Sequence, residues 1–402
     1  MTIPPGALAL DLPPNWADKY VVTYNFKTDI FTSRSGRECR CSLRASPRIG
    51  LEFTSALRGE RLRTFNLQML ASQNARAFLP LQSECRRVVS GLQLSEQVCT
   101  VDIVAPWMTP GAYVFLQGPQ GSEGFVISGV SGADVSFDLL PSLSFPAGAR
   151  IMPALSGRIR TGMGSAHVTS AYGNIAVKFD ADPATAWSYT PPLAPVTYKG
   201  YEVWSTPPNW RDGASIVHAN PRSDLDFDTG RVIYFEPVAW DRRTTQLNFL
   251  GRSNAGAQLL LDTFYRCQGQ RVPFWMPTWE NDLPILSLVA GGSAFQTTAV
   301  SALQAAGSPT YKHVALWLRD GGIVIRRVLA MAQNGSAACT VQLDSALPGD
   351  LDASSVRMAC WLMPVRFASD TFTQEWATDG IAESTVVFQM LPEDDVLEDW
   401  EV

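Results

Sequence analysis

The chain has 402 residues, of which 46% are hydrophobic and 17% charged, and its formal net charge is −6. This apolar fraction excludes a wholly disordered protein, and the acidic balance argues against nucleic acid as a partner, because phosphate binding needs clustered positive charge. No apolar run reaches the roughly 20 residues of a membrane helix, and residues 1–16 lack the features of a signal peptide. We therefore expect a folded protein of two or three domains, made in the cytoplasm, with no membrane partner.

A short motif near the start of the chain recurs near its middle. Pro-Pro-Asn-Trp occurs at Pro13–Trp16 and again at Pro207–Trp210, 194 residues later, and Gly36-Arg37 recurs as Gly230-Arg231 at the same spacing. Three further segments recur in the same order: Gly50–Leu57 with Gln246–Ser253, Ala149–Pro153 with Cys360–Pro364, and Asn174–Phe179 with Glu383–Phe388. Convergent β-domain composition is the alternative explanation, but ordered matches favour a tandem duplication.

Each copy is predicted to be mostly β. Leu62, Phe65 and Met69 have the spacing of one amphipathic helix in the first copy, and a similar stripe lies near Leu260 in the second. The segments 113–140 and 314–343 both have the pattern of three strands joined by tight turns. The expected fold class is mainly β with a few helices: two tandem homologous β-sandwich or barrel domains, each with one amphipathic helix.

Proline-rich stretches set the expected boundaries. We predict a first β domain at 1–188 with an extended N-terminal arm, a Pro-rich linker at 189–200, a second β domain at 201–390, and an acidic-apolar C-terminal arm at 391–402. Both terminal arms mix apolar residues with prolines or acids and have little to fold on alone. We therefore expect Met1–Trp16 and Pro392–Val402 to lie on neighbouring subunits.

Residues for catalysis are scarce. The chain has only three histidines, with no zinc-hydrolase spacing, no nucleophile elbow and no phosphate-binding loop. We therefore assign no catalytic residue, no cofactor and no metal ligand, and expect no enzyme. Cys39 and Cys41 share one face of a predicted strand and are weak candidates for half of a metal or iron–sulfur site, with ordinary free cysteines the favoured alternative.

Large aromatic and aliphatic groups are the candidate interaction residues. Trp275 and Trp279 flank a proline; exposed, they would form a carbohydrate or protein contact, whereas buried, which we favour, they would plug the junction of helix and sheet. Leu397 and Trp400 lie among the acidic residues of the C-terminal arm and would anchor it to a neighbour, unless the tail is frayed and solvated.

Two stretches of the second copy, PFWMPTWENDLPI and WLMPVRFASDTFTQEWATDGIAESTVVFQM, resemble tail-tip or baseplate proteins of long-tailed bacteriophages, the distal tail or minor tail proteins. The shared pattern is a strand ending at Met363-Pro364, an Arg366–Asp370 step, a polar strand at Thr373–Trp376 and a closing strand at Ser384–Phe388. The resemblance implies a structural protein of the virion, forming a ring between the tail tube and the central hub or baseplate with its host-recognition proteins.

The resemblance also implies a symmetry. Tail tubes of this family are six-fold and the tip beneath is three-fold, so a chain of two homologous domains predicts a homotrimer with pseudo-six-fold symmetry, with a plain homohexamer as the alternative. A receptor- or carbohydrate-binding module on the tail tip is the second functional hypothesis. A tail-associated cell-wall hydrolase is the third, although it would need an acid–base or Cys/His pair that the sequence does not offer.

Overall fold

The structure is a computed structural model that describes residues 8–33, 36–71, 76–159, 165–182, 191, 194–219, 223–228, 230–235, 242–305, 310–335 and 338–393. It is 51% strand and 11% helix, with two α-helices in the described residues, which confirms the mainly-β prediction. Neither described helix is long and apolar enough to cross a membrane.

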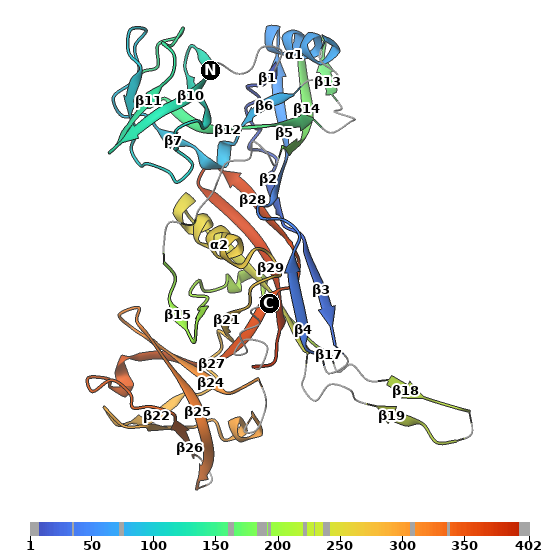
Figure 1. The fold of residues 1–402 in the computed structure, drawn as a ribbon, viewed down its shortest axis with the longest axis vertical. Coiled ribbons are helices and arrows are strands. Elements are labelled where there is room, and N and C mark those ends of the chain that lie inside the picture. The colour runs from blue at the N-terminus through green and yellow to red at the C-terminus, as the bar shows by residue number, and fades with distance from the viewer. Residues whose placement is uncertain are drawn as a thin grey trace.

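The first half of the fold contains strands β1 to β14 and helix α1 (Figure 1). Its elements are β1 (Leu8–Ala9), β2 (Tyr20–Asn25), β3 (Thr28–Thr32), β4 (Glu38–Ser42), β5 (Arg48–Arg58), α1 (Glu60–Ala71), β6 (Ala77–Pro80), η1 (Gln82–Glu84), β7 (Arg86–Arg87), β8 (Val98–Thr100), β9 (Tyr113–Gly118), β10 (Gly121–Ser131), β11 (Asp134–Phe137), β12 (Arg150–Ile159), β13 (Ser165–Thr169) and β14 (Tyr172–Ala181).

The second half contains β15 to β29 and helix α2. Its elements are β15 (Thr197–Tyr198), β16 (Tyr201–Glu202), η2 (Trp210–Asp212), β17 (Ser215–Ala219), β18 (Ser223–Leu225), β19 (Ile233–Phe235), β20 (Arg242–Gly251), α2 (Asn254–Cys267), β21 (Phe274–Pro277), β22 (Ile285–Leu288), β23 (Ala294–Thr297), η3 (Val300–Ala305), β24 (His313–Leu318), β25 (Ile323–Asn334), β26 (Ala338–Leu343), η4 (Ala353–Ser355), β27 (Val356–Phe367), β28 (Thr371–Thr378) and β29 (Ile381–Met390).

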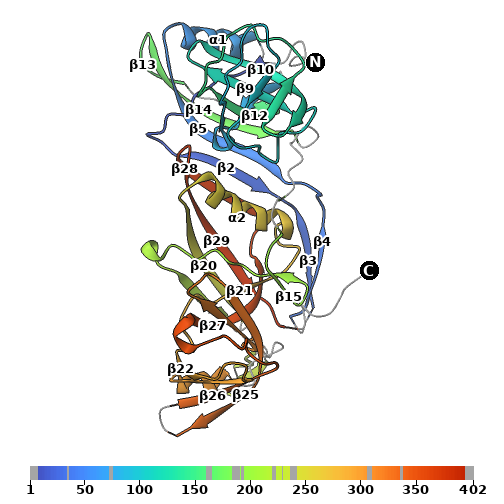
Figure 2. The same ribbon diagram turned by 90° about the vertical axis from the view of Figure 1, so that its left-hand side faces the viewer.

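Each half has a central antiparallel sheet. The strand order is β13-β14-β5-β2 in the first half and β28-β29-β20-β17 in the second. Strand β2 also pairs with β28, so the two sheets join edge to edge into one continuous sheet, as both Figure 1 and Figure 2 show.

Alternating side chains explain why these strands cover a core on one face. Residues 48–58 of β5 alternate between buried and more exposed positions, the period of a half-buried strand. Helix α2 packs on the inner face of the second sheet, where the Ser253 Oγ accepts from the Gly256 N–H as its N-cap. Gly251 allows this close approach, because a Cβ there would lie 2.7 Å from the Ala257 nitrogen.

A small barrel is inserted into each half and has its own core. In the first half it is built from β7 to β11 and the start of β12, around Trp107, Phe125 and Phe137. In the second half β22 to β26 and the start of β27 enclose a core that includes Phe295 and Trp361.

The strand pairings of the two halves correspond residue by residue. Leu51 pairs with Val22 and Phe179, and Thr245, 194 residues after Leu51, pairs with Ile216 and Phe388. Ala9 pairs in parallel with Phe78, as Val203 does with Trp275. We infer from this common order and register that the halves are copies of one unit.

The repeated Pro-Pro-Asn-Trp motif has one structural role in both halves. The Asn15 N–H donates to the Thr54 carbonyl and the Asn209 N–H donates to the Asn248 carbonyl, each at 2.7 Å. The motif therefore fastens the lead-in segment of each copy to the middle of its long central strand, β5 or β20.

The structure corrects two of the segment matches made from the sequence. Gly50 corresponds to Thr244 and not to Gln246. Gly50 pairs with Asp180 of β14, and Thr244 pairs with Gln389 at the equivalent position of β29. Ala154 of β12 corresponds to Leu362 of β27, since they pair with Pro80 and Pro277 at the ends of β6 and β21. The match between Asn174–Phe179 and Glu383–Phe388 agrees with the strand register.

The core does not divide at the predicted linker. One hydrophobic cluster runs through both halves, where Tyr24 and Phe26 of the first lie against Tyr265 of α2 at ring-centroid distances of 5.9 and 5.8 Å. Thr197–Tyr198, within the predicted linker, form β15 and pair with β16, so the end of this segment folds onto the second half.

Candidate assembly interface

The pairing of β2 with β28, here called the central joint, holds the two halves together. It is antiparallel over six residue pairs, from Tyr20 with Trp376 to Asn25 with Thr371. The Phe26 N–H donates to the Asp370 carbonyl at 2.9 Å at its end. Lys19 and Glu375 form an exposed ion pair across it. The Lys19 ammonium donates a hydrogen bond to the Glu375 carboxylate, and this contact raises the pKa of Lys19.

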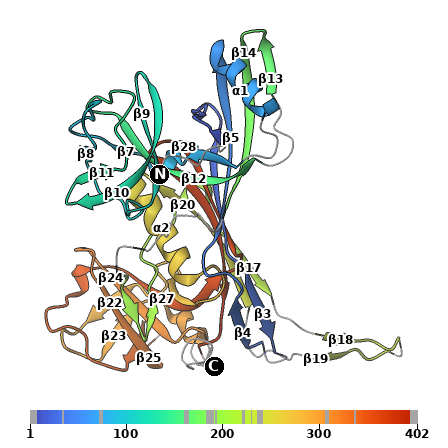
Figure 3. The same ribbon diagram turned by 45° about the horizontal axis from the view of Figure 1, so that its top comes forward.

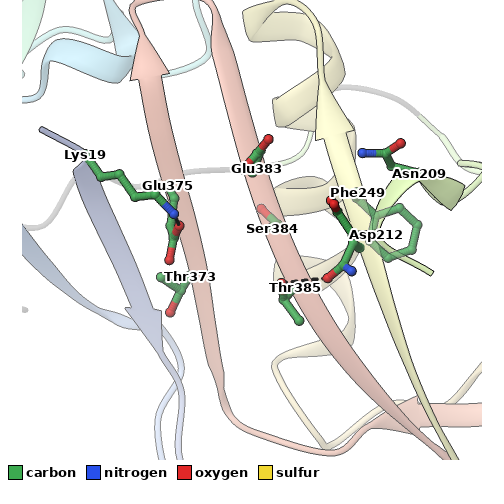
Figure 4. A pocket seen from close by; sticks show the side chains of 10 residues that line it. Lys19, Asn209, Asp212, Phe249, Thr373, Glu375, Glu383, Ser384 and Thr385 are labelled. Atoms are coloured by element: carbon green, nitrogen blue, oxygen red, sulfur yellow. Dashed lines mark hydrogen bonds and ion pairs between the residues drawn. The ribbon is translucent and has the colours of Figure 1, made fainter. Parts of the chain in front are cut away.

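A polar groove of about 310 Å³ lies over the central joint (Figure 4). Lys19 reaches across to Glu375, while Glu383, Thr385 and Asp212 line its other side. None of its lining residues is His or Cys, so it offers no nucleophile–histidine pair. Across the described residues, no group of three His, Cys, Asp or Glu side chains is arranged to hold a metal.

The hairpin β3–β4 of the first half is docked on the second half. Glu38 accepts two hydrogen bonds from the Arg366 guanidinium, at 2.7 and 2.9 Å, and the side chains are only 8% and 11% exposed. Thr28 donates from its N–H and its hydroxyl to the Asp370 carboxylate, at 2.6 and 2.9 Å. Arg40 donates to the Arg271 carbonyl at 3.1 Å.

The electrostatics of this docked hairpin favour the ionised pair. Burial by itself raises the pKa of Glu38, but the hydrogen bonds and charge of Arg366, with Arg40 assisting, outweigh burial and lower the pKa below its ordinary value. Bidentate guanidinium–carboxylate contacts are both strong and geometrically specific. The two halves are therefore held together by the strand pairing of the central joint and by the directional ion pair of the docked hairpin.

Two sheet edges stay open and correspond to the strands of the central joint. In the described part of the chain β17 pairs only with β20, and β13 only with β14. Ile216 of β17 follows Val22 of β2 by 194 residues. Strands β13 and β28 also have the same irregularity in their pairing. The register shifts after His167 in β13 and after Trp376 in β28.

Exposure of these edges matches their position. All five residues of β17 are exposed, with Val217 at 56%, and Val168 of β13 is 64% exposed. Unpaired sheet edges are templates for another strand, and proteins usually cover or break them. The molecule thus ends on one side with a counterpart of β2 and on the other with a counterpart of β28.

The structure places Trp275 and Trp279 in the interior, which corrects their assignment as interaction residues. Trp275 is fully buried, and its indole N–H donates to the Tyr198 carbonyl at 2.9 Å. Trp279 is 6% exposed and lies against Trp317, with ring centroids 4.9 Å apart. Trp275 packs on Tyr198 and His313, so neither indole can stack on a sugar, which removes the best evidence for a carbohydrate-binding module.

The remaining sequence candidates have separate outcomes. Cys39 and Cys41 lie on β4, where both are exposed. Leu397 and Trp400 lie outside the described residues. The prediction for the N-terminal arm is wrong for residues 8–16: β1 pairs with β6 of its own chain, and Leu10 and Leu12 are buried there.

The start of the C-terminal arm is also held by its own chain. Glu393 is 3% exposed and contacts Lys312, Arg327 and the buried His313. Burial alone would raise the pKa of Glu393, but hydrogen bonds from His313 and Lys312 lower it to about 2. The Lys312 and Arg327 cations and the His313 ring hold the carboxylate against the second small barrel, contrary to the prediction that Pro392 onward lies on a neighbour.

Sequence reasoning missed the docked hairpin, because Glu38 and Arg366 are 328 residues apart and no local signal connects them. Sequence reasoning also missed the buried carboxyl of Glu84, because no local signal connects this residue with its neighbours on α2. This carboxyl is buried at the contact between η1 and α2, where the pKa of Tyr265 responds to its charge. Burial raises the pKa of Glu84 to about 7; Arg86 opposes this rise and Asp262 adds to it.

The raised pKa of Glu84 predicts that the stability of the fold depends on pH. A raised carboxyl pKa means that its stabilising contribution is complete below about pH 4.5 and is lost as the pH rises through about 7. We expect Glu84→Gln to abolish a loss of about 3 kcal/mol between pH 4.5 and 8. Hydrogen exchange of the η1 and α2 amides at both pH values, corrected for the intrinsic exchange rates, measures it; Glu96→Gln, at an exposed position, is the control, and an equal pH dependence of Glu84→Gln and wild type would contradict the prediction.

The comparisons with known proteins do not name a family. A scan against protein-family models gives no match to this chain, and a search of curated proteins gives none either.

Proposed function

We propose that the protein is a structural component of the tail tip or baseplate of a long-tailed bacteriophage, where it forms a ring between the tail tube and the central hub. The resemblance of the second half to distal tail and minor tail proteins supports the phage assignment. The central joint supports the ring, and it is the observation that carries the proposal.

The argument for a ring follows from the open edges. Strand β17 is the counterpart of β2, and β13 is the counterpart of β28, so a second chain can place its β13 on β17 as β28 lies on β2. In the register of the central joint, Ser215 would face Ala166 of the next chain and Ile216 would face Ser165. Such an interface is heterologous, and its repetition closes into a ring when the rotation permits.

Three chains are the favoured number. Each chain carries two similar units, so a ring of three chains has six similar units and three-fold symmetry. One face of the ring can then match a six-fold tail tube, and the other face can match a three-fold hub. The proposed location is the tail of the virion. A ring of six chains is the alternative.

The test is the size and symmetry of the assembly. We expect native mass spectrometry to give three times the chain mass and electron microscopy to show a ring of six similar lobes, and intact tails to contain three chains per ring. A chain that stays monomeric at micromolar concentration, or a six-chain ring lined by only one half of each chain, would contradict the proposal.

A further inference from the structure

The second half carries a counterpart of the docked hairpin, and in the described part of the chain its strands β18 and β19 pair only with each other. Strands β18 and β19 pair Asp224 with Tyr234, the residues 194 positions after the Ile30 and Arg40 pair of β3 and β4. The β18–β19 hairpin stands out from the body of the molecule in both Figure 1 and Figure 3.

The composition of this hairpin calls for a partner. Tyr234 lies on the same face as Asp224, the counterpart of the docked face of β3–β4, and is 59% exposed, whereas Leu225 and Ile233 lie on the opposite face. An isolated two-stranded hairpin is marginally stable in water, so contact with a partner would stabilise it. In β3–β4, by contrast, the face formed by Thr28, Ile30, Glu38, Arg40 and Ser42 is half-buried against the second half.

The first half carries a counterpart of the surface that receives a hairpin. Arg158 occupies in β12 the place of Arg366 in β27, because Arg158 pairs with Asp180 and Arg366 with Gln389 on the corresponding closing strands. Arg366 is buried beneath Glu38, whereas Arg158 is exposed and has no carboxylate partner in the described part of the chain.

Arg158 also lines an open groove of about 750 Å³, here called the receiving groove. Its lining residues come from β2, β5, β12 and β14 and the loop before β5: Thr23, Asn25, Arg44, Arg48, Ile49, Gly50, Glu52, Gly157, Arg158, Asp180, Ala181 and Asp182. Three guanidinium groups and three carboxylates lie along it.

One acid of the hairpin matches one arginine of the groove. Glu38 faces Thr32 across β3–β4, and the same two positions of the second hairpin are Val232 and Asp226. The carboxylate is therefore on the opposite strand of the hairpin, but the pair still offers one acid to one arginine. Asp224 and Asp228 add negative charge nearby and Arg231 adds positive charge.

We propose that the β18–β19 hairpin of one chain docks in the receiving groove of a second copy of the chain, with Asp226 paired to Arg158. This inference rests on the proposed function, because it supplies a second contact between neighbouring chains of the ring. Each contact between chains then repeats both contacts between the two halves of one chain, the strand pairing and the docked hairpin.

Cross-linking between two labelled populations tests it. Both carry Cys39→Ser and Cys41→Ser, since these thiols are exposed. One population, with its own tag, carries Asp226→Cys and the other Arg158→Cys; a short bis-maleimide is added after mixing, and only product with both tags is counted. The control replaces Arg158→Cys with Ser131→Cys, an exposed position on the first small barrel.

We expect at least about tenfold more linked product for the Asp226 and Arg158 positions than for the control. We also expect Asp226→Arg to lower ring affinity by about tenfold, and Asp226→Arg with Arg158→Asp to restore it, because like charges in a contact are repulsive. Native mass spectrometry of the same samples reports the ring.

The outcomes separate the two proposals. A ring with cross-linking no higher than the control would overturn hairpin docking and leave the strand pairing in place. Cross-linking without a closed ring would support hairpin docking and overturn the ring. Monomers without cross-linking would overturn both.

Discussion

Replacing Ile216 with proline is expected to abolish ring assembly and to leave the chain folded. Phe26 donates its N–H across the central joint, and alternation along the strand then directs the N–H of Val22 the same way. Ile216 is the counterpart of Val22, so its N–H points to the open edge and away from β20. Proline there removes a donor that only a neighbouring chain would use.

The expected loss is about 1 to 3 kcal/mol for each joint between chains, because a carbonyl of the neighbouring chain is left without a donor; about 3 kcal/mol is roughly a hundredfold in the association constant. Sedimentation velocity over a concentration series measures it. Ile216→Thr is the matched control, because it changes the side chain and keeps the N–H, and it should assemble as the wild type does. Wild-type assembly of Ile216→Pro, with an unchanged thermal midpoint, would rule out β17 as the joining edge.

Replacing Glu38 with alanine is expected to release the β3–β4 hairpin from the second half. It leaves the Arg366 guanidinium buried without its carboxylate, and breaking one side of a buried ion pair costs about 3 kcal/mol or more. Because a chain with several cores does not unfold in one step, the quantity to measure is local opening by hydrogen exchange of the β3 and β4 amides.

Two variants make this measurement specific. Glu38→Leu combined with Arg366→Met should cost far less than Glu38→Ala, because no charge is then left unpaired. Lys19→Met removes an exposed ion pair at the same joint and should cost less than about 1 kcal/mol. Equal protection of β3 and β4 in wild type and Glu38→Ala would show that the ion pair does not hold the hairpin.

Local patterns were sufficient to predict the mainly-β class and to indicate the duplication that we infer from the strand register. The motif at Pro13–Trp16 recurs because each copy uses it to fasten the same strand, through Asn15 and Asn209. The match of Gly50–Leu57 was displaced by two residues for a physical reason. A shift of two keeps every side chain on its own face of a strand, so a pattern of alternation does not detect it.

The match of β12 with β27 failed for a different reason. Both strands are buried along most of their length, over 151–157 and 359–367, so their sequences lack the alternation of a half-buried strand. Such runs carry no register. Only the pairing of each strand with its neighbours determines which residues correspond.

The sequence by itself determined the fold class and the existence of two copies, because strand period, turn residues and repeated motifs are local properties. The tertiary structure decided everything that depends on distant partners. It buried Trp275 and Trp279, paired Glu38 with Arg366, and joined β2 to β28. It also left β13, β17 and the β18–β19 hairpin exposed, and exposure is a property of the whole packed chain, which no segment carries alone.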